Sequence, residues 1–161
     1  MQLSLHTDYA LRTLMALAAS GSQLSVDTIA RRYAISRNHL AKVAQRLQAE
    51  GLVTTARGRT GGMRLARAVD DINVGDVVRR FETLDSFVAC FGSAPTGCAL
   101  QGVCGLNGAL AGALDAFLAH LDGYRLSDLV LDRATILRRL GLERGAAVDG
   151  DSNQAQGAPS P

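Results

Sequence analysis

Long hydrophobic runs are missing from this chain of 161 residues, and so is the opening that marks a secreted protein. No apolar stretch approaches the roughly 20 residues that a membrane-spanning helix needs. The first residues, MQLSLHTDYALR, lack the basic start and apolar run of a signal peptide. We therefore expect a cytoplasmic protein that has no membrane partner.

The chain also lacks the residue patterns of an enzyme and of a common zinc site. No nucleophile is paired with a base and no glycine-rich phosphate loop is present, so we expect no catalytic activity. The three cysteines include no C-x2-C or C-x4-C pair, which zinc ribbons and fingers normally carry. None of the histidines, His6, His39 and His120, lies in the cysteine segment.

Basic residues are concentrated in the first part of the chain. Residues 1–67 contain ten basic and three acidic side chains, a net charge of +7, whereas the remainder carries −5. A segment this basic favours a polyanionic partner, with nucleic acid as the first candidate. A solvated charged face has the same composition, so charge alone does not decide between them.

The basic part contains a helix-turn-helix pattern. Apolar spacing predicts a first helix that is capped by Thr7 or Asp8 and stops at Gly21. Two more helices are predicted in residues 25–51, with a tight turn near Ala34. A short helix, a turn and a longer helix are typical of this DNA-binding motif.

The second helix of that pair has polar side chains opposite its apolar stripe. In the major groove, arginine can form a fork on guanine and asparagine can do so on adenine. The predicted DNA contacts are Ser36, Arg37, Asn38, His39 and Lys42. The alternative is an ordinary helical pair whose outer residues are polar.

A β-hairpin is predicted directly after the helix-turn-helix, which together make a winged helix. Its strands are residues 52–57 and 63–66, joined by the glycine-rich tip GRTGG. Arg57 and Arg59 at this tip are further predicted DNA contacts, because the minor groove has a negative potential that attracts arginine. The alternative is an exposed loop whose charges only aid solubility.

A long amphipathic helix is predicted in residues 106–124, after a fourth helix in residues 73–84. Its apolar stripe has the spacing of an interhelical seam. The stripe consists of Leu106, Leu110, Ala113, Leu114, Phe117, Leu118 and Leu121. A stripe this broad needs cover, either within the chain or in a homodimer, and a twofold dimer suits palindromic double-stranded DNA.

The expected fold is mainly α with a small β-wing: a winged helix-turn-helix domain plus a long dimerisation helix. The expected divisions are a DNA-binding domain (1–83), a cysteine-rich cluster-binding loop (84–104), the dimerisation helix with C-terminal elements (105–142) and a disordered tail (143–161). The tail is assigned from its Gly, Ala, Ser and Pro content.

All three cysteines lie in one segment, CFGSAPTGCALQGVC, with the spacing C-x7-C-x5-C. Clustered thiols in a reducing compartment more often bind metal or sense redox state than form structural disulfides. Wide spacing suits an iron–sulfur cluster, which would then have one iron without a thiolate ligand. Three unrelated thiols, a thiol switch or a zinc site are the alternatives.

Together, these motifs resemble the IscR/NsrR family of iron–sulfur transcription regulators. The resemblance covers residues 1–142 and rests on QLSLHTDYALR, SRNHL, RGRTGG, INVGDVVR, GVCGL and LSDLV. Within the family the chain is most similar to the NsrR-type, nitric-oxide-sensing repressors. Asp8 matches the aspartate that completes their cluster from the opposite subunit, and Asn107 stands where IscR-type members have a histidine ligand.

The resemblance implies a dimeric repressor that leaves its operator when nitric oxide reacts with its cluster. The implied cluster ligands are Cys90, Cys98 and Cys104, with Asp8 from the partner subunit. A 4Fe–4S cluster is favoured over 2Fe–2S, although the first cysteine spacing is longer than is usual in the family. The alternative is a winged-helix regulator that senses redox state through a two-iron cluster, a thiol switch or zinc.

Overall fold

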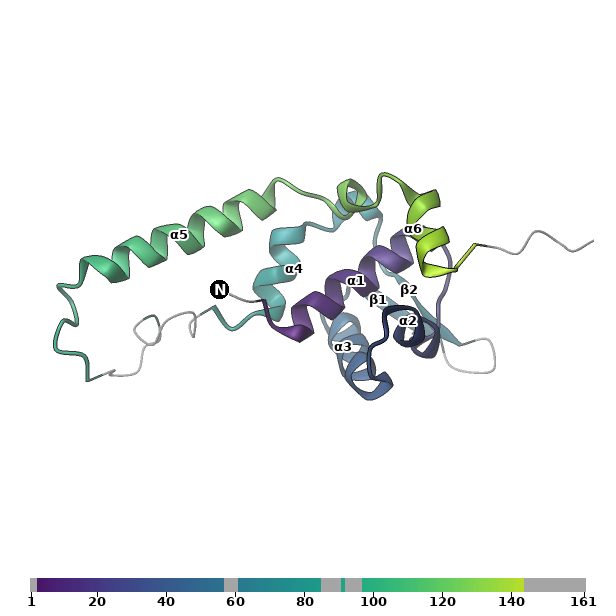
Figure 1. Ribbon diagram of the computed structural model, residues 1–161, viewed down its shortest axis with the longest axis horizontal. Coiled ribbons are helices and arrows are strands. Elements are labelled where there is room, and N and C mark those ends of the chain that lie inside the picture. Colours follow the sequence, from purple (N-terminus) through teal and green to yellow (C-terminus); the bar gives the residue numbers. More distant parts are fainter. Residues whose placement is uncertain (1–2, 57–60, 85–90, 92–96, 144–161) are drawn as a thin grey trace, which may run out of the picture.

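The computed structural model of the chain describes residues 3–56, 61–84, 91 and 97–143. In the described residues the fold is mainly helical and contains one two-stranded antiparallel sheet. A lobe of short helices and the sheet is joined to one long helix, which extends well beyond it (Figure 1). In chain order, the elements are α1 (Leu5–Ser20), α2 (Val26–Tyr33), α3 (Arg37–Ala49), β1 (Val53–Ala56), β2 (Gly62–Leu65), η1 (Val69–Asp71), α4 (Val74–Phe81), α5 (Gly105–Asp122), η3 (Leu126–Val130) and α6 (Arg133–Leu140).

Helix α1 is the centre of the lobe and packs against α3, α4, α6 and η3. Its N-cap is Ser4, three residues before Thr7, and the Ser4 Oγ accepts a hydrogen bond from the Thr7 backbone N–H at 3.2 Å. The prediction of Thr7 or Asp8 as the cap was therefore wrong. Thr7 is fully buried inside the first turn. The predicted stop is confirmed, since Gly21 follows the helix with φ of 60°.

The predicted helix-turn-helix is present as α2 and α3. Ser25 caps α2, and its Oγ accepts a hydrogen bond from the Thr28 N–H at 3.0 Å. The helix ends at Tyr33, and the next residue, Ala34, has a left-handed backbone with φ of 52°. This turn directs the chain into α3, where Leu40 and Val43 are fully buried.

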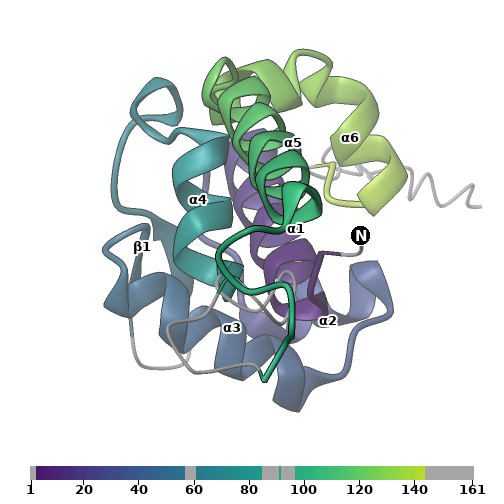
Figure 2. The same ribbon diagram turned by 90° about the vertical axis from the view of Figure 1, so that its left-hand side faces the viewer.

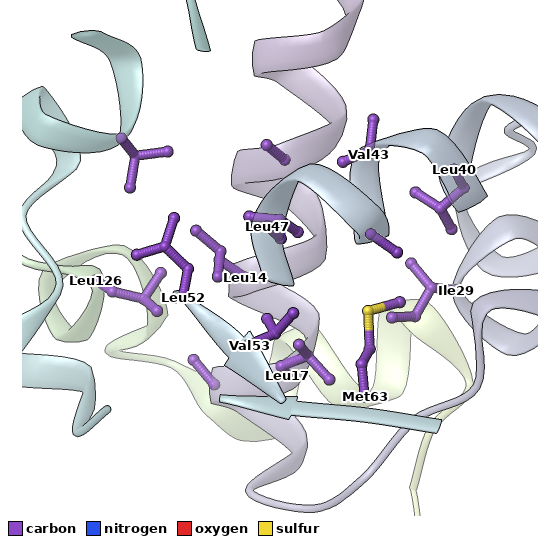
Figure 3. Packing of buried hydrophobic residues seen from close by; sticks show 14 of the residues in the cluster. Leu14, Leu17, Ile29, Leu40, Val43, Leu47, Leu52, Val53, Met63 and Leu126 are labelled. Atoms are coloured by element: carbon purple, nitrogen blue, oxygen red, sulfur yellow. The ribbon is translucent and has the colours of Figure 1, made fainter. Parts of the chain in front are cut away.

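The wing packs its inner face on the same hydrophobic core. Val53 pairs with Leu65 and Thr55 with Met63 in the antiparallel register of β1 and β2. Val53 and Met63 are buried among side chains of α1, α2 and α3 (Figure 3). A fully buried aliphatic side chain contributes about 1.5–3 kcal/mol to folding, so this core holds the wing against the helix-turn-helix.

Helix α5 contacts the lobe through α4 and runs past it (Figures 1 and 2). Two of its leucines, Leu114 and Leu118, are buried in a second cluster with Val78 of α4. Leu106, near the start of α5, is 66% exposed. The predicted stripe is therefore only partly covered within its own chain.

Several predicted features fall on residues that the structure does not describe. Arg57 and Arg59 at the wing tip, Cys90, and residues 144–161 of the predicted tail lie outside the described ranges. Within the described part of the chain, no helix has the length and apolar character needed to cross a membrane.

Candidate functional site

The polar face of α3 is open to solvent. Arg37, Asn38, His39 and Lys42 are all exposed, as their positions opposite the buried leucines require. Ser36 is the N-cap residue of α3, and its side chain makes no capping hydrogen bond. The predicted contact residues on this helix therefore form one accessible surface of suitable chemistry for base edges and phosphates.

One of these residues has an intramolecular partner that the sequence did not reveal. The Nε of Arg37 donates to Asp27 Oδ1 of α2 at 2.5 Å, and the two side chains are 69% and 56% exposed. The ion pair spans the turn of the motif. The pair uses the Nε of Arg37, and it places a carboxylate beside one of the predicted DNA contacts.

The outer face of the wing has one hydrogen bond to α3, the second helix of the helix-turn-helix, and one between its own strands. The Thr55 hydroxyl donates to Gln48 Oε1 of α3 at 2.9 Å. On the neighbouring pair, Arg64 Nε donates to Thr54 Oγ1 at 3.3 Å. The first bond joins the base of the wing to α3, and the second joins the two strands of the wing to each other.

Asp8 lies in the first turn of α1, at the edge of the lobe. Its Oδ1 accepts a hydrogen bond from Arg12 Nε at 2.9 Å, and the two side chains are 36% and 47% exposed. The Arg12 guanidinium also lies 5.9 Å from the ring centre of Tyr33, at the end of α2. Burial raises the pKa of Tyr33, while the nearby charge of Arg12 acts to lower it. Arg12 thus connects Asp8 to the helix that precedes the recognition helix.

Two of the three cysteines line one pocket of about 240 Å³. Hydrogen-bonded turns fold this segment, from Gln101 N to Cys98 O at 3.1 Å and from Val103 N to Leu100 O at 3.1 Å. Cys98 is exposed and Cys104 is half-buried. The pocket is lined by Cys98, Leu100, Gln101, Gly102, Cys104 and Asn107.

The chemistry of this pocket fits an iron–sulfur cluster. Cys104 is the N-cap residue of α5, so its sulfur lies at the positive end of an 18-residue helix. Cysteine thiolates are the protein ligands that hold iron–sulfur clusters, and this pocket has two cysteines in its lining. Asn107, one turn into the helix, is an amide and not an imidazole.

The described residues of one chain do not supply a complete ligand set. Among them, no group of three His, Cys, Asp or Glu side chains is arranged to hold a metal ion. Asp8 is not among the residues that line the cysteine pocket. Of the predicted ligands, the structure thus brings together Cys98 and Cys104, while Cys90 is outside the described residues.

Comparisons with known proteins agree with this architecture. The HTH-type transcriptional regulator NsrR of Bacillus subtilis is 45% identical over 145 residues, which is 89% of this chain and 99% of that protein. The solved structure of IscR from T. potens has a TM-score of 0.65 and 26% identity, covering 82% of this chain and 88% of its own. CymR, the global cysteine regulator of B. subtilis, has a TM-score of 0.64 and 27% identity, covering 80% and 95%.

These comparisons confirm the predicted winged-helix fold and the assignment to transcription regulators. Residues 3–132 match the family described as Rrf2, an iron-dependent transcriptional regulator. The match covers the elements from α1 to η3, with the cysteine segment and all of α5, and ends just before α6. The chain therefore belongs to the Rrf2 family of transcriptional regulators.

Proposed function

We propose that this protein is an NsrR-type repressor of the cytoplasm, a homodimer that binds a palindromic operator and releases it in response to nitric oxide. The observation that carries the proposal is the separation of the ligand set. Two thiols line a pocket at the start of α5, and Asp8 stands elsewhere, on the first helix of the DNA-binding lobe. A partner subunit can supply what each chain's own pocket lacks.

The exposed apolar side chains of α5 support the homodimer. Leu106 is 66% exposed, whereas Leu114 and Leu118, which share its stripe, are already buried by α4. A stripe that is buried near its middle and open near its start is the arrangement expected of a helix that packs against a second copy. A twofold dimer would present two copies of α3 to successive major grooves about one helical turn apart.

Cys90, Cys98 and Cys104 of one chain, with Asp8 of the partner subunit, would hold the cluster, for which we favour the 4Fe–4S form. When bound, such a cluster supplies iron that reacts with nitric oxide. An aspartate binds that iron less tightly than a thiolate would, so the carboxylate is the ligand expected to dissociate first. Cys104 would hold the cluster from the N-cap position of α5.

The contacts of Asp8 suggest how ligand loss reaches the DNA-binding face. A carboxylate that binds metal has less negative charge to offer Arg12, so the 2.9 Å pair weakens while Asp8 is a ligand. The position of the Arg12 guanidinium over the Tyr33 ring, at the end of α2, then changes. A preference of 1–3 kcal/mol for one lobe geometry changes operator affinity by about 5–150-fold.

The proposal is tested by native mass spectrometry of protein purified without oxygen, before and after substoichiometric nitric oxide. We expect a dimer with four irons and four sulfides per chain, and parallel loss of binding to a palindromic duplex. A mass with two irons per chain would support a DNA-binding regulator that senses redox state and not nitric oxide. A bare dimer or one zinc per chain would refute the cluster, and weak, salt-insensitive DNA binding would refute the repressor.

A further inference from the structure

The recognition helix is joined to α4 by four side chains, which we name the α3–α4 clasp: Arg46 and Glu50 from α3 and its cap, and Arg80 and Phe81 from α4. The guanidinium of Arg46 lies 4.8 Å from the ring centre of Phe81. Its Nη2 also donates a hydrogen bond to the backbone carbonyl of Arg80. Arg80 Nη1 in turn donates to Glu50 Oε2 at 3.1 Å.

The clasp lies where two parts of the molecule meet. Helix α4 packs principally on α1 and α5, and it is linked to α3 by these long side chains together with the shared hydrophobic core. Phe81 is only 3% exposed and belongs to the core of the lobe, whereas Val78, one turn earlier, belongs to the cluster beneath α5. A shift in the position of α4 would therefore alter its packing on α5 and, through the clasp, the position of α3.

The cysteine segment begins just beyond the clasp. Phe81 is the last residue of α4, and Cys90 follows it by nine residues. At the other end of that segment, Cys104 caps α5, and α5 is fixed to α4 by two hydrogen bonds between Arg79 and Asp122 at 2.5 and 2.7 Å. The segment thus follows α4 directly at one end, and its other end is linked to α4 through the length of α5.

Arginine has particular properties at position 46. Its planar guanidinium can lie over an aromatic ring and donate to a carbonyl at the same time, which lysine cannot do with one compact ammonium group. Arg46 thus joins α3 to the backbone of α4. A shift of α4 would therefore move α3, through a contact that depends on geometry and not only on charge.

We propose that Arg46 is the positioning residue through which the state of the cysteine segment sets the placement of the recognition helix. This inference rests on the proposed function, since it assigns the path by which cluster loading changes operator affinity. Arg46 acts through Phe81 and the Arg80 carbonyl, and the coupling requires no contact between Arg46 and DNA.

The test compares the operator affinity of the cluster-loaded and cluster-free dimer for wild type, Arg46→Met and Arg46→Lys, at the same series of salt concentrations for each protein. Wild type is expected to show a ratio within the range of about 5–150-fold. Both variants should retain their cluster absorbance and reduce that ratio to about twofold or less. Arg46→Lys keeps the positive charge, so its failure to restore the ratio would show that geometry is required.

Arg138→Met is the matched control, because it also removes one arginine charge from an exposed helical position, on α6. It should leave the ratio unchanged. If Arg46→Met instead weakens both forms equally and lowers the salt slope by about one, Arg46 is a phosphate contact and the inference is wrong. A wild-type ratio of one refutes the proposed function and this inference together, whereas a wild-type ratio that survives both Arg46 variants refutes this inference alone.

Discussion

The carboxylate of Asp8 accepts a hydrogen bond from Arg12 at 2.9 Å, one helical turn along α1. Asp8 is the residue that we propose as a ligand to the cluster of the partner subunit, and in this structure its carboxylate is paired with Arg12. Because Arg12 also contacts the ring of Tyr33, the choice of partner for Asp8 is connected to the helix-turn-helix. Asp8 is thus placed to link ligand binding with the position of the DNA-binding lobe.

Replacing Asp8 with alanine should weaken the response to nitric oxide without dissociating the dimer. The reason is that α5, which we expect to form the dimer seam, does not include Asp8. We expect the ratio of loaded to unloaded operator affinity to fall to about twofold or less. The measurements are iron and sulfide content, operator binding and sedimentation velocity.

Asp70→Ala is the control for this variant, since it removes an exposed carboxylate from η1. It should behave like wild type in all three measurements. If Asp8→Ala binds its operator and releases it with nitric oxide as wild type does, the link through Asp8 is wrong.

Local sequence patterns predicted most of the fold because its helices have local signals. The N-cap of α2 is Ser25, as its sequence position predicts. The positive φ angles after α1 and α3 fall on Gly21 and Gly51. The start of α1 was predicted wrongly because Ser4, Thr7 and Asp8 are all acceptable caps. Tertiary contacts decide among them: Thr7 is fully buried, and the Ser4 N–H donates to Glu82 at 2.7 Å.

The contacts of the candidate site depend on residues far apart in the sequence. The partner of Arg37 is Asp27, ten positions away, and Arg46 contacts Phe81 across 35 positions. Helical and strand periodicity relates only residues close in the sequence, so it does not predict such pairs. The leucine stripe of α5 was predictable as a stripe, but its division between α4 and a second copy depends on where α4 lies.

Replacing Asn107 with histidine should make the cluster less dependent on Asp8 as a ligand. Asn107 lines the pocket with Cys98 and Cys104, so an imidazole there could ligate iron from the same chain. We expect the cluster to be retained and operator release to require a higher ratio of nitric oxide to protein. Nitrogen ligation should appear in pulsed electron paramagnetic resonance of the reduced cluster.

Asn107→Ala provides the comparison, because it removes the amide without adding a ligand. If Asn107→His shows no nitrogen coupling and still depends on Asp8 as wild type does, then position 107 does not face the cluster.

Removing Asp27 should tighten operator binding. Arg37 pairs with this carboxylate at 2.5 Å on an exposed surface, and such pairs are worth about 0.2–1 kcal/mol. Asp27→Asn should therefore increase affinity by no more than about fivefold. Fluorescence anisotropy with a labelled operator measures the change, and Arg37→Ala should abolish it in the double variant. An increase that persists without Arg37 would point to a general charge effect.

A charge in the open part of the α5 stripe should dissociate the dimer without unfolding the lobe. Leu106 is 66% exposed, so Leu106→Glu removes little from the chain's own core. We expect sedimentation velocity to show a monomer whose helical circular dichroism is close to that of wild type. Ala109→Glu is the control, because Ala109 is exposed and outside the predicted stripe. A Leu106→Glu protein that remains a dimer would place the interface elsewhere.

The joint between α4 and α5 gives the fold a specific acid sensitivity. Arg79 donates two hydrogen bonds to the Asp122 carboxylate, and these bonds lower the pKa of Asp122 below its ordinary value of 3.8. The same joint needs glycine at position 75, because a Cβ there would overlap Asp122 Oδ1. The two helices therefore approach closely at the point where the pair forms.

A carboxyl group whose pKa is lowered by folding stabilises the folded state above its unfolded pKa. That stabilisation is lost as the pH falls through the lower, folded pKa. The melting temperature of Asp122→Asn should therefore be below that of wild type at pH 7, and the difference should shrink once the pH falls below about 4. Arg79→Met should lose the same stability, and the double variant should lose no more than either single variant. Additive losses, or a difference that does not change with pH, would show that the two side chains act separately and that the joint depends on packing at Gly75 instead.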